Sequence, residues 1–222
     1  MWALLITTLL AAGAPSPLEL ARDHQDRAAL QKMADDYAAA AAKTPNDGPA
    51  QYRLALACSY MAEVAQQQRD KKQAQAAALR GVAAAEKALA LKPEAENFRL
   101  LGTLYAQAIT DVFSGLNYGP RAKDAINKAV EKAPRSSQVY VARGVGNYYV
   151  PAQLGGGTAM AIADFRKAIE LDARNADAWL WLGIALHKDN KDAEARQALS
   201  KALELDPNRV WAKQELDKIP AK

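Results

Sequence analysis

Few side chains in this chain belong to the types that bind metals or act as nucleophiles. The two histidines, His24 and His187, lie far apart, and neither has a Cys or His neighbour at the spacing of a metal site. The single cysteine, Cys58, cannot form a disulfide within the chain and follows a helical pattern, which predicts a small core residue. We therefore predict no metal, no cofactor and no enzymatic activity, although a catalytic triad is recognised in space and not by sequence.

Three consecutive glycines raise the question of a phosphate-binding loop. Gly155, Gly156 and Gly157 precede Thr158, and glycine N–H groups before a helix do bind anions. No strand pattern precedes them and no Lys-Ser or Lys-Thr pair follows. The pattern therefore favours a tight turn in which Thr158 caps the next helix.

The composition is that of a globular protein. Half of the 222 residues are apolar, and 24% are charged, which argues against disorder. The net charge is +4, but basic and acidic residues alternate along the chain. We therefore predict no nucleic-acid partner, with a weak basic stripe as the open alternative because spacing does not show how charges cluster in space.

Residues 1–14 form an apolar segment without a charged side chain, and the segment ends in small residues. This pattern predicts a signal peptide, and the apolar run is too short for a stable membrane span. The segment lacks the basic residues that usually begin a signal peptide. We expect a periplasmic or secreted protein, with a short apolar helix of a cytoplasmic protein as the alternative.

A spacing of large, small and proline residues recurs through the rest of the chain. Its clearest copy consists of Trp179, Leu182, Gly183, Leu186, Ala195, Leu199, Ala202 and Pro207. This copy resembles a tetratricopeptide repeat (TPR), in which Gly183 and Ala195 let two antiparallel helices touch and Pro207 ends the second helix. The resemblance implies an all-α fold, a right-handed superhelical solenoid of antiparallel helix pairs.

Equivalent alanines mark the earlier copies. They are Ala40, Ala88, Ala129, Ala168 and Ala202, which gives steps of 48, 41, 39 and 34 residues. The chain divides accordingly into a signal peptide (1–14), an N-terminal linker and unpaired helix (15–45), four repeats (46–93, 94–134, 135–173 and 174–207) and a C-terminal capping helix and tail (208–222). A capping element is expected because the last repeat would otherwise expose its apolar face.

The excess over 34 residues predicts where the repeats are enlarged. Residues 62–78 contain no Gly or Pro, which predicts two long helices around a turn near residues 69–72. Residues 114–120 and residues 150–158 are rich in Gly and contain Pro, which predicts two long loops between helices. At the level of the whole chain, the long first repeat and the Gly-Gly loop resemble exported bacterial TPR proteins and, more faintly, the regulator of microtubule dynamics family.

The TPR resemblance also implies a groove, because the first helix of each repeat lines the concave face of such an array. The implied groove residues are Tyr52, Leu56, Tyr60, Arg99, Thr103, Gln107, Val141, Val145, Tyr148, Tyr149, Leu180, Ile184 and Lys188. Most of them are aliphatic or aromatic. A face of this composition marks a binding site or is covered by the protein itself.

Arg143 stands where the repeat usually has a leucine, one turn before Asn147. A buried arginine must be paired, so we predict an ion pair with Asp111 or Asp164. An alternative hypothesis is that Arg143, Asn147 and Tyr149 form a ligand-facing corner.

These features predict a non-catalytic scaffold that binds a peptide or partner protein in its concave groove through shape and apolar burial. One alternative is a carrier of a small apolar ligand or lipid, which would require a closed cavity. Another is a subunit of a larger assembly. Fold does not imply function, so the partner stays unidentified.

Overall fold

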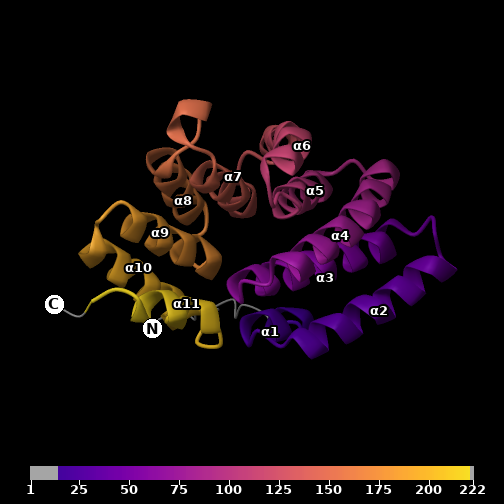
Figure 1. Cartoon of the computed structure of the whole chain (residues 1–222), viewed down its shortest axis with the longest axis horizontal. Coiled ribbons are helices and arrows are strands. Elements are labelled where there is room, and N and C mark those ends of the chain that lie inside the picture. Colours follow the sequence, from indigo (N-terminus) through magenta and orange to yellow (C-terminus); the bar gives the residue numbers. More distant parts are fainter. Residues whose placement is uncertain (1–14, 221–222) are drawn as a thin grey trace, which may run out of the picture.

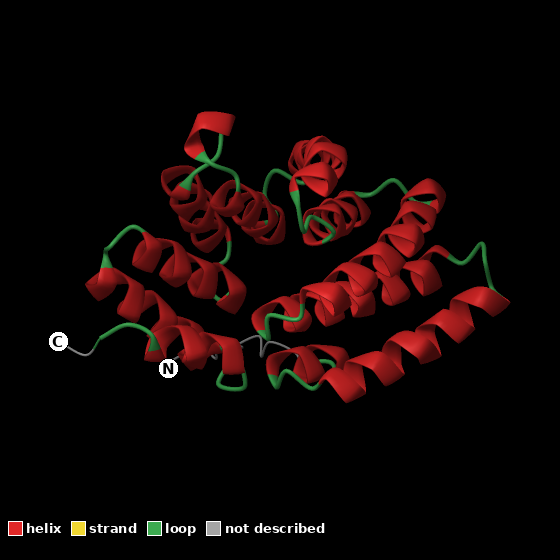
Figure 2. Cartoon of the chain, in the orientation of Figure 1, coloured by secondary structure: helices red, strands yellow, loops and turns green. Residues whose placement is uncertain are grey.

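The computed structural model describes residues 15–220. These residues form eleven α-helices and one short 3-10 helix, with no strand among them (Figure 1 and Figure 2). The elements are α1 (Pro17–Asp23), α2 (Arg27–Lys43), α3 (Gly48–Gln67), α4 (Lys71–Leu91), α5 (Ala95–Gln107), α6 (Val112–Lys132), α7 (Ser137–Tyr149), η1 (Ala152–Leu154), α8 (Thr158–Leu171), α9 (Ala176–Lys188), α10 (Asp192–Leu205) and α11 (Val210–Asp217). The predicted signal peptide lies outside the described residues.

Consecutive helices pack in pairs: α3 with α4, α5 with α6, α7 with α8 and α9 with α10. The first helices of successive pairs also contact one another in order, from α1 through α3, α5 and α7 to α9. The predicted fold class, a helical solenoid of repeats, is confirmed. Figure 1 shows that the solenoid curls so far that α11 lies near α1.

Glycine allows the paired helices to approach closely. A Cβ atom on Gly144 would lie 2.5 Å from Phe165 Cε1, and one on Gly183 would lie 2.5 Å from Leu199 Cγ. Neither distance is compatible with a side chain, so the packing role predicted for Gly183 is confirmed. Phe165 and Leu199 are fully buried at these crossings.

The long first pair turns where the sequence predicts. α3 ends at Gln67 and α4 begins at Lys71. Arg69 adopts a left-handed conformation with φ 61°, and the Asp70 side chain accepts a hydrogen bond from the Gln73 N–H. No Gly or Pro is needed because a single left-handed residue and a capping aspartate complete the turn.

The predicted loop at residues 114–120 is wrong, because α6 runs through it with Pro120 inside the helix. Two local contacts offset the backbone hydrogen bond that Pro120 cannot donate. The Asp111 side chain accepts from the Ser114 N–H at 2.8 Å, while the Asp111 N–H donates to Ser114 Oγ at 3.0 Å. Tyr118 stacks on Tyr105 with ring centroids 5.8 Å apart.

The Asp111 cap should therefore hold the first two turns of α6. We expect Asp111→Ala to lower the free energy of unfolding by about 1 kcal/mol and to speed amide exchange at residues 112–119, as measured by hydrogen–deuterium exchange. Asp124→Ala, at an exposed position in the same helix, is the control. Equal exchange in both variants would contradict this role for the cap.

The second predicted loop, at residues 150–158, is confirmed apart from its cap. α7 ends at Tyr149 and α8 begins at Thr158, with η1 between them. The predicted Thr158 cap is wrong, since Gly157 occupies the capping position at φ 104° and no side chain caps the helix. The Gly157 N–H instead donates to the Asn147 carbonyl oxygen at 2.8 Å, which returns the loop to the end of α7.

The helix predicted to be unpaired at the N-terminus, α2, has a short partner. α1 contains seven residues, begins with a capping box between Ser16 and Glu19, and packs against α2 and α3. Its Leu18 and Ala21 are buried. Seven residues are too few for a visible helical period, which is why the sequence pattern misses this helix. None of the helices within residues 15–220 is long and apolar enough to cross a membrane.

Candidate functional site

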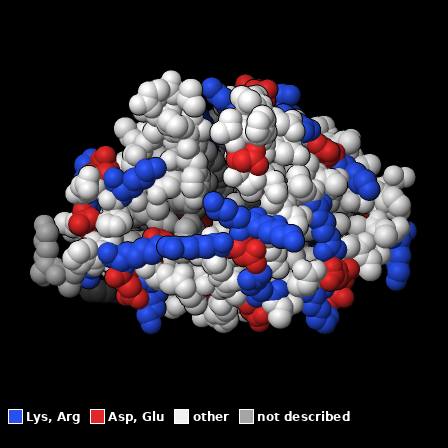
Figure 3. All heavy atoms as spheres, in the orientation of Figure 1, with Lys and Arg blue, Asp and Glu red and all other residues white. Residues whose placement is uncertain are grey.

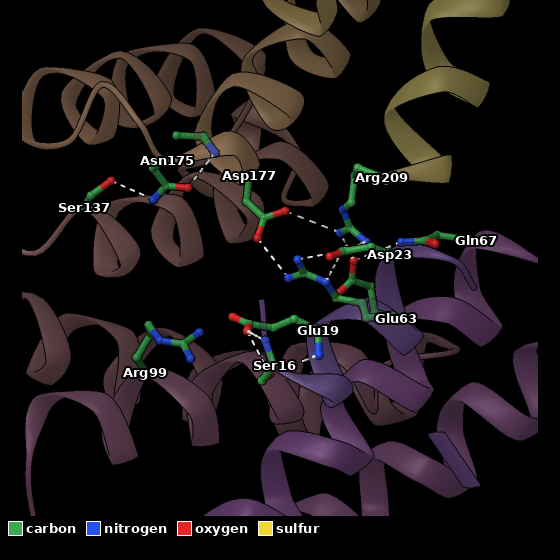
Figure 4. A network of polar contacts seen from close by, with 12 residues as sticks. Ser16, Glu19, Asp23, Glu63, Gln67, Arg99, Ser137, Asn175, Asp177 and Arg209 are labelled. Atoms are coloured by element: carbon green, nitrogen blue, oxygen red, sulfur yellow. Dashed lines mark hydrogen bonds and ion pairs between the residues drawn. The ribbon is translucent and has the colours of Figure 1, made fainter. Parts of the chain in front are cut away.

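The two ends of the solenoid meet in a cluster of buried and half-buried charged side chains. Its members come from α1, α3, α9 and the residue before α11, and they are Arg22, Asp23, Glu63, Asp177 and Arg209. Arg22 Nη2 lies 2.7 Å from Asp23 Oδ1, and Arg22 Nη1 lies 3.0 Å from Asp177 Oδ2. Figure 4 shows Asp23, Glu63 and Asp177 converging on Arg209. We call these five residues the terminal cluster.

The terminal cluster holds three carboxylates and two guanidinium groups. Asp23 and Arg209 each expose only 3% of the side chain. Burial, offset only in part by Arg22 and Arg209, raises the pKa of the Asp23 carboxyl to about 6, and the Asp206 carboxylate acts in the same direction as burial. Burial acts in the same direction on Asp177, but Arg22 and Arg209 outweigh it and hold the pKa of that carboxyl below its ordinary value.

Arg209 is only partly satisfied. Its Nη2 bonds Glu63 and lies 3.4 Å from Asp177 Oδ1, and its Nη1 lies 3.3 Å from Asp23 Oδ1. Both Nε and Nη1 are buried, and neither has a hydrogen-bond partner within residues 15–220. A buried donor without a partner costs free energy, about 1 to 3 kcal/mol for a typical group. The terminal cluster therefore stabilises the contact between the two ends less than its ion pairs alone would indicate.

The repeat pattern of the sequence does not predict the terminal cluster, but one residue type in the sequence indicates it. Arg209 occupies the repeat position of Asn175, 34 residues earlier. Asn175 caps α9 by accepting a hydrogen bond from the Ala178 N–H at 3.1 Å. An arginine has no acceptor for that bond, so its appearance at a capping position indicates a different use of the side chain.

The predicted groove residues on α3 and α5 form a polar surface whose groups are mostly paired. Arg99 donates to both oxygens of Glu96, at 2.7 and 2.5 Å, and the Tyr52 hydroxyl donates to Glu96 at 2.8 Å. Tyr60 lies beneath Arg22, whose guanidinium carbon is 4.8 Å from the ring centroid. The N-terminal helix α1 thus covers part of the groove, which is the self-covering alternative considered from sequence.

Other predicted groove residues belong to the core. Leu180 is fully buried, and Val141 and Ile184 are nearly so, so these three cannot contact a partner in this conformation. Their side chains fill the contacts between α7, α8 and α9. The remaining set is half-buried, and consists of Leu56, Thr103, Gln107, Val145 and Tyr148, while Lys188 and Tyr149 are exposed.

Arg143 forms the predicted ion pair, and its partner is Asp164. The Arg143 Nε and Nη2 atoms donate to Asp164 Oδ1 at 3.0 and 2.6 Å, and Asn147 Nδ2 donates to Asp164 Oδ2 at 2.8 Å. Asp164 is buried, whereas the Arg143 side chain is 36% exposed. Arg143 and Asn147 therefore join α7 to α8, and their polar groups are engaged within the chain.

An aromatic corner lies at the end of α7, next to α9 and α11. We use this name for Tyr148, Tyr149, Trp181 and Trp211, whose rings meet edge to face with centroids 5.0 to 6.2 Å apart. Lys188 Nζ lies 4.1 Å from the Tyr148 ring centroid. A pocket of about 360 Å³ opens beside this corner, lined by the two tyrosines, Lys188 and the loop after α7.

Exposed apolar side chains concentrate at the start of α6 and around the connection between α7 and α8. Nine large apolar residues are exposed within residues 15–220, and seven of them lie between residues 112 and 160. The seven are Val112, Phe113, Leu116, Tyr149, Val150, Leu154 and Met160. Figure 3 shows two uncharged protrusions, over α6 and over η1, on either side of a hollow. We call these seven residues the apolar edge.

Cys58 is the small core residue that the sequence predicts. Its side chain is fully buried, and burial raises the pKa of the thiol to about 11. The thiolate that a nucleophile requires is therefore scarce at neutral pH.

Comparisons with known proteins agree with the repeat fold. Residues 155–210 match the tetratricopeptide repeat family. The crystal structure of a thermophilic TPR protein from Thermus thermophilus is similar at a TM-score of 0.60 and 20% identity, covering 90% of this chain and 97% of that one. The TPR protein YrrB, described as having an unusual peptide-binding site, is similar at a TM-score of 0.47 and 17% identity, covering 88% and 94%. No curated protein matches the sequence.

The fold defines the described part of this molecule as an all-helical solenoid of repeats, and its residues 155–210 match the tetratricopeptide repeat family. The TPR resemblance found in the sequence is confirmed at this level.

Proposed function

We propose that this protein is a non-catalytic scaffold that binds a partner protein through the apolar edge and the aromatic corner. The observation that carries the proposal is the placement of seven of the nine exposed large apolar residues within residues 15–220 at the start of α6 and around the connection between α7 and α8. Scattered surface apolar residues need no explanation, whereas a concentration of this kind is typical of an interaction site. Tyr and Trp are also the residue types enriched at the centres of protein interfaces.

This placement differs from the central groove that the sequence predicts. Most polar groups there are paired within the chain, and α1 covers Tyr60. The aromatic corner, by contrast, presents Tyr149 with 68% of its surface exposed beside an open pocket. The Tyr149 part of the ligand-corner hypothesis is retained, while Arg143 and Asn147 act by holding α7 on α8.

No observation favours the alternative of a carrier for a small apolar ligand. The pocket beside the aromatic corner opens to solvent, and so does a second one of about 260 Å³ on the outer face, lined by Trp179, Leu182 and Glu194 among others. A carrier would need an enclosed apolar cavity.

The proposed place of action rests on the N-terminal segment. The apolar residues 1–14 support export, as does the resemblance to exported bacterial TPR proteins, so we infer a partner in the periplasm or outside the cell. Cell fractionation of the full-length chain, with the N-terminus of the recovered protein determined by mass spectrometry, tests this inference.

The surface can be tested by partner capture with matched variants. We expect Phe113→Ser combined with Leu154→Ser to weaken partner binding at least tenfold, because burying each large apolar side chain contributes about 1.5 to 3 kcal/mol. The measurement is quantitative mass spectrometry of proteins captured from the host, followed by a binding isotherm with the purified partner. Thermal stability should not change, since both side chains are exposed.

The control is Leu79→Ser combined with Leu91→Ser, which changes two exposed leucines on α4 that do not belong to the apolar edge. If binding depended only on the total exposed apolar surface, both double variants would lose affinity equally. That result, or full binding by the Phe113 and Leu154 double variant, would refute the proposed surface.

A further inference from the structure

The contact between the ends of the solenoid is made by polar side chains. Besides the terminal cluster, Gln25 and Gln214 of α11 exchange two side-chain hydrogen bonds, each of 3.1 Å. The buried apolar cluster that includes α1 and the one that includes α11 share no residue. The two ends are therefore joined by charge and hydrogen bonds.

Contacts between buried charged groups contribute little net free energy to stability. Removing charged groups from water costs free energy that their mutual attraction repays only when every group is well bonded. Arg209 does not meet that condition, because Nε and Nη1 have no hydrogen-bond partner in the described part of the chain. Separating the ends would return the five charged groups to water without opening an apolar core.

We propose that the terminal cluster is a latch, so that the solenoid has a closed state, in which α1 meets α9 and the start of α11, and an open state, in which these ends separate and the face between them is uncovered. The hinge need involve no helix melting, because small rotations between successive repeats suffice to move the ends apart. The use of the uncovered face by a partner rests on the proposed function, whereas the motion itself does not.

Protonation of Asp23 should shift the equilibrium between the closed and the open state. The groups that face Asp23 from the surrounding elements are Arg22, Glu63, Asp177, Asp206 and Arg209. Asp23 is the most buried of the three carboxylates of the terminal cluster, and its burial in the closed state disfavours the charged form. Because the closed state favours a protonated Asp23 and the open state exposes this group, acid favours closure and a rise in pH through about 6 favours opening.

The latch can be tested by measuring the distance between the two ends. The full chain, with Cys58→Ala, Ala28→Cys and Lys213→Cys, receives spin labels at two exposed positions on α2 and α11. Double electron–electron resonance then gives the distance distribution. We expect one narrow distribution at pH 5, and with Arg209→Met a broad one shifted outward by at least about 10 Å, roughly the spacing of packed helices.

Matched variants separate the latch from general loosening. Arg143→Met removes an ion pair within one helix pair, to Asp164, and should leave the distance unchanged. Asp23→Asn should stay closed from pH 5 to pH 8, while the unmodified latch gains an open fraction over that range. If Arg209→Met does not fold, Asp177→Asn replaces it, because Asp177 is more exposed.

An identical distribution in the Arg209→Met chain and its parent at both pH values would overturn the latch. So would an equal outward shift in Arg143→Met. These readouts need no partner protein, so failure of the latch is distinguishable from failure of the proposed binding surface.

Discussion

Replacing Phe165 with alanine is expected to lower the free energy of unfolding by about 3 to 5 kcal/mol. Phe165 is fully buried, stacks on Trp181 with ring centroids 6.1 Å apart, and fills the space left open by Gly144. Truncation leaves a cavity that the helices cannot close, because Gly144 has no side chain to move into it. Denaturant unfolding followed by circular dichroism measures the change.

Phe113→Ala is the matched control for this prediction, since the same residue type is 84% exposed there. We expect it to change stability by no more than about 0.5 kcal/mol. Similar losses in the two variants would contradict the assignment of Phe165 to the core and of Phe113 to the surface. The pair thus separates apolar residues that build the solenoid from those available to a partner.

The second large effect is expected in the pH dependence of stability. Burial raises the pKa of Asp23 to about 6, against an ordinary value of 3.8. A carboxyl group with a raised folded-state pKa contributes stability that is complete below 3.8 and is lost as the pH rises through about 6. This contribution should be on the order of 3 kcal/mol.

Asp23→Asn removes this titration, because asparagine resembles the protonated carboxyl group. We expect the variant to match the wild type near pH 4 and to exceed its stability at pH 8, as measured by urea unfolding across the range. Asp177 has a lowered pKa and works in the opposite direction, with stability lost only as the pH falls below 3.8. A stability difference between variant and wild type that is independent of pH would contradict the raised pKa of Asp23.

Local rules account for what the sequence predicted correctly and for where it failed. Gly183 and Leu199 follow the repeat spacing, and their contact is the one that the spacing requires. The loop expected at residues 114–120 is helical because a capping box and a tyrosine stack outweigh the preference of Gly and Pro for turns. Whether such a segment forms a helix or a loop depends on which residues lie next to it in space, and composition does not show these neighbours.

The candidate site also contains residues that the sequence predicts correctly and one that it misplaces. The sequence indicates the tyrosines at the end of α7 because they precede a loop with three glycines, and it predicts the Arg143 ion pair because a buried guanidinium needs a partner. Leu180 was placed in the groove by repeat position, yet the packing of α9 buries it completely. A position within one repeat does not tell how tightly the next repeats close over it.

By itself, the sequence determined that this protein is a solenoid of helix pairs, because each repeat's small, large and proline residues specify contacts with its immediate neighbours. Only the tertiary structure decided that the ends meet, bringing Arg209 to Asp23 and Glu63. The physical reason is that curvature is the sum of small rotations at every repeat contact. No single contact encodes that sum, so residues far apart in the sequence become partners only once all the repeats have packed.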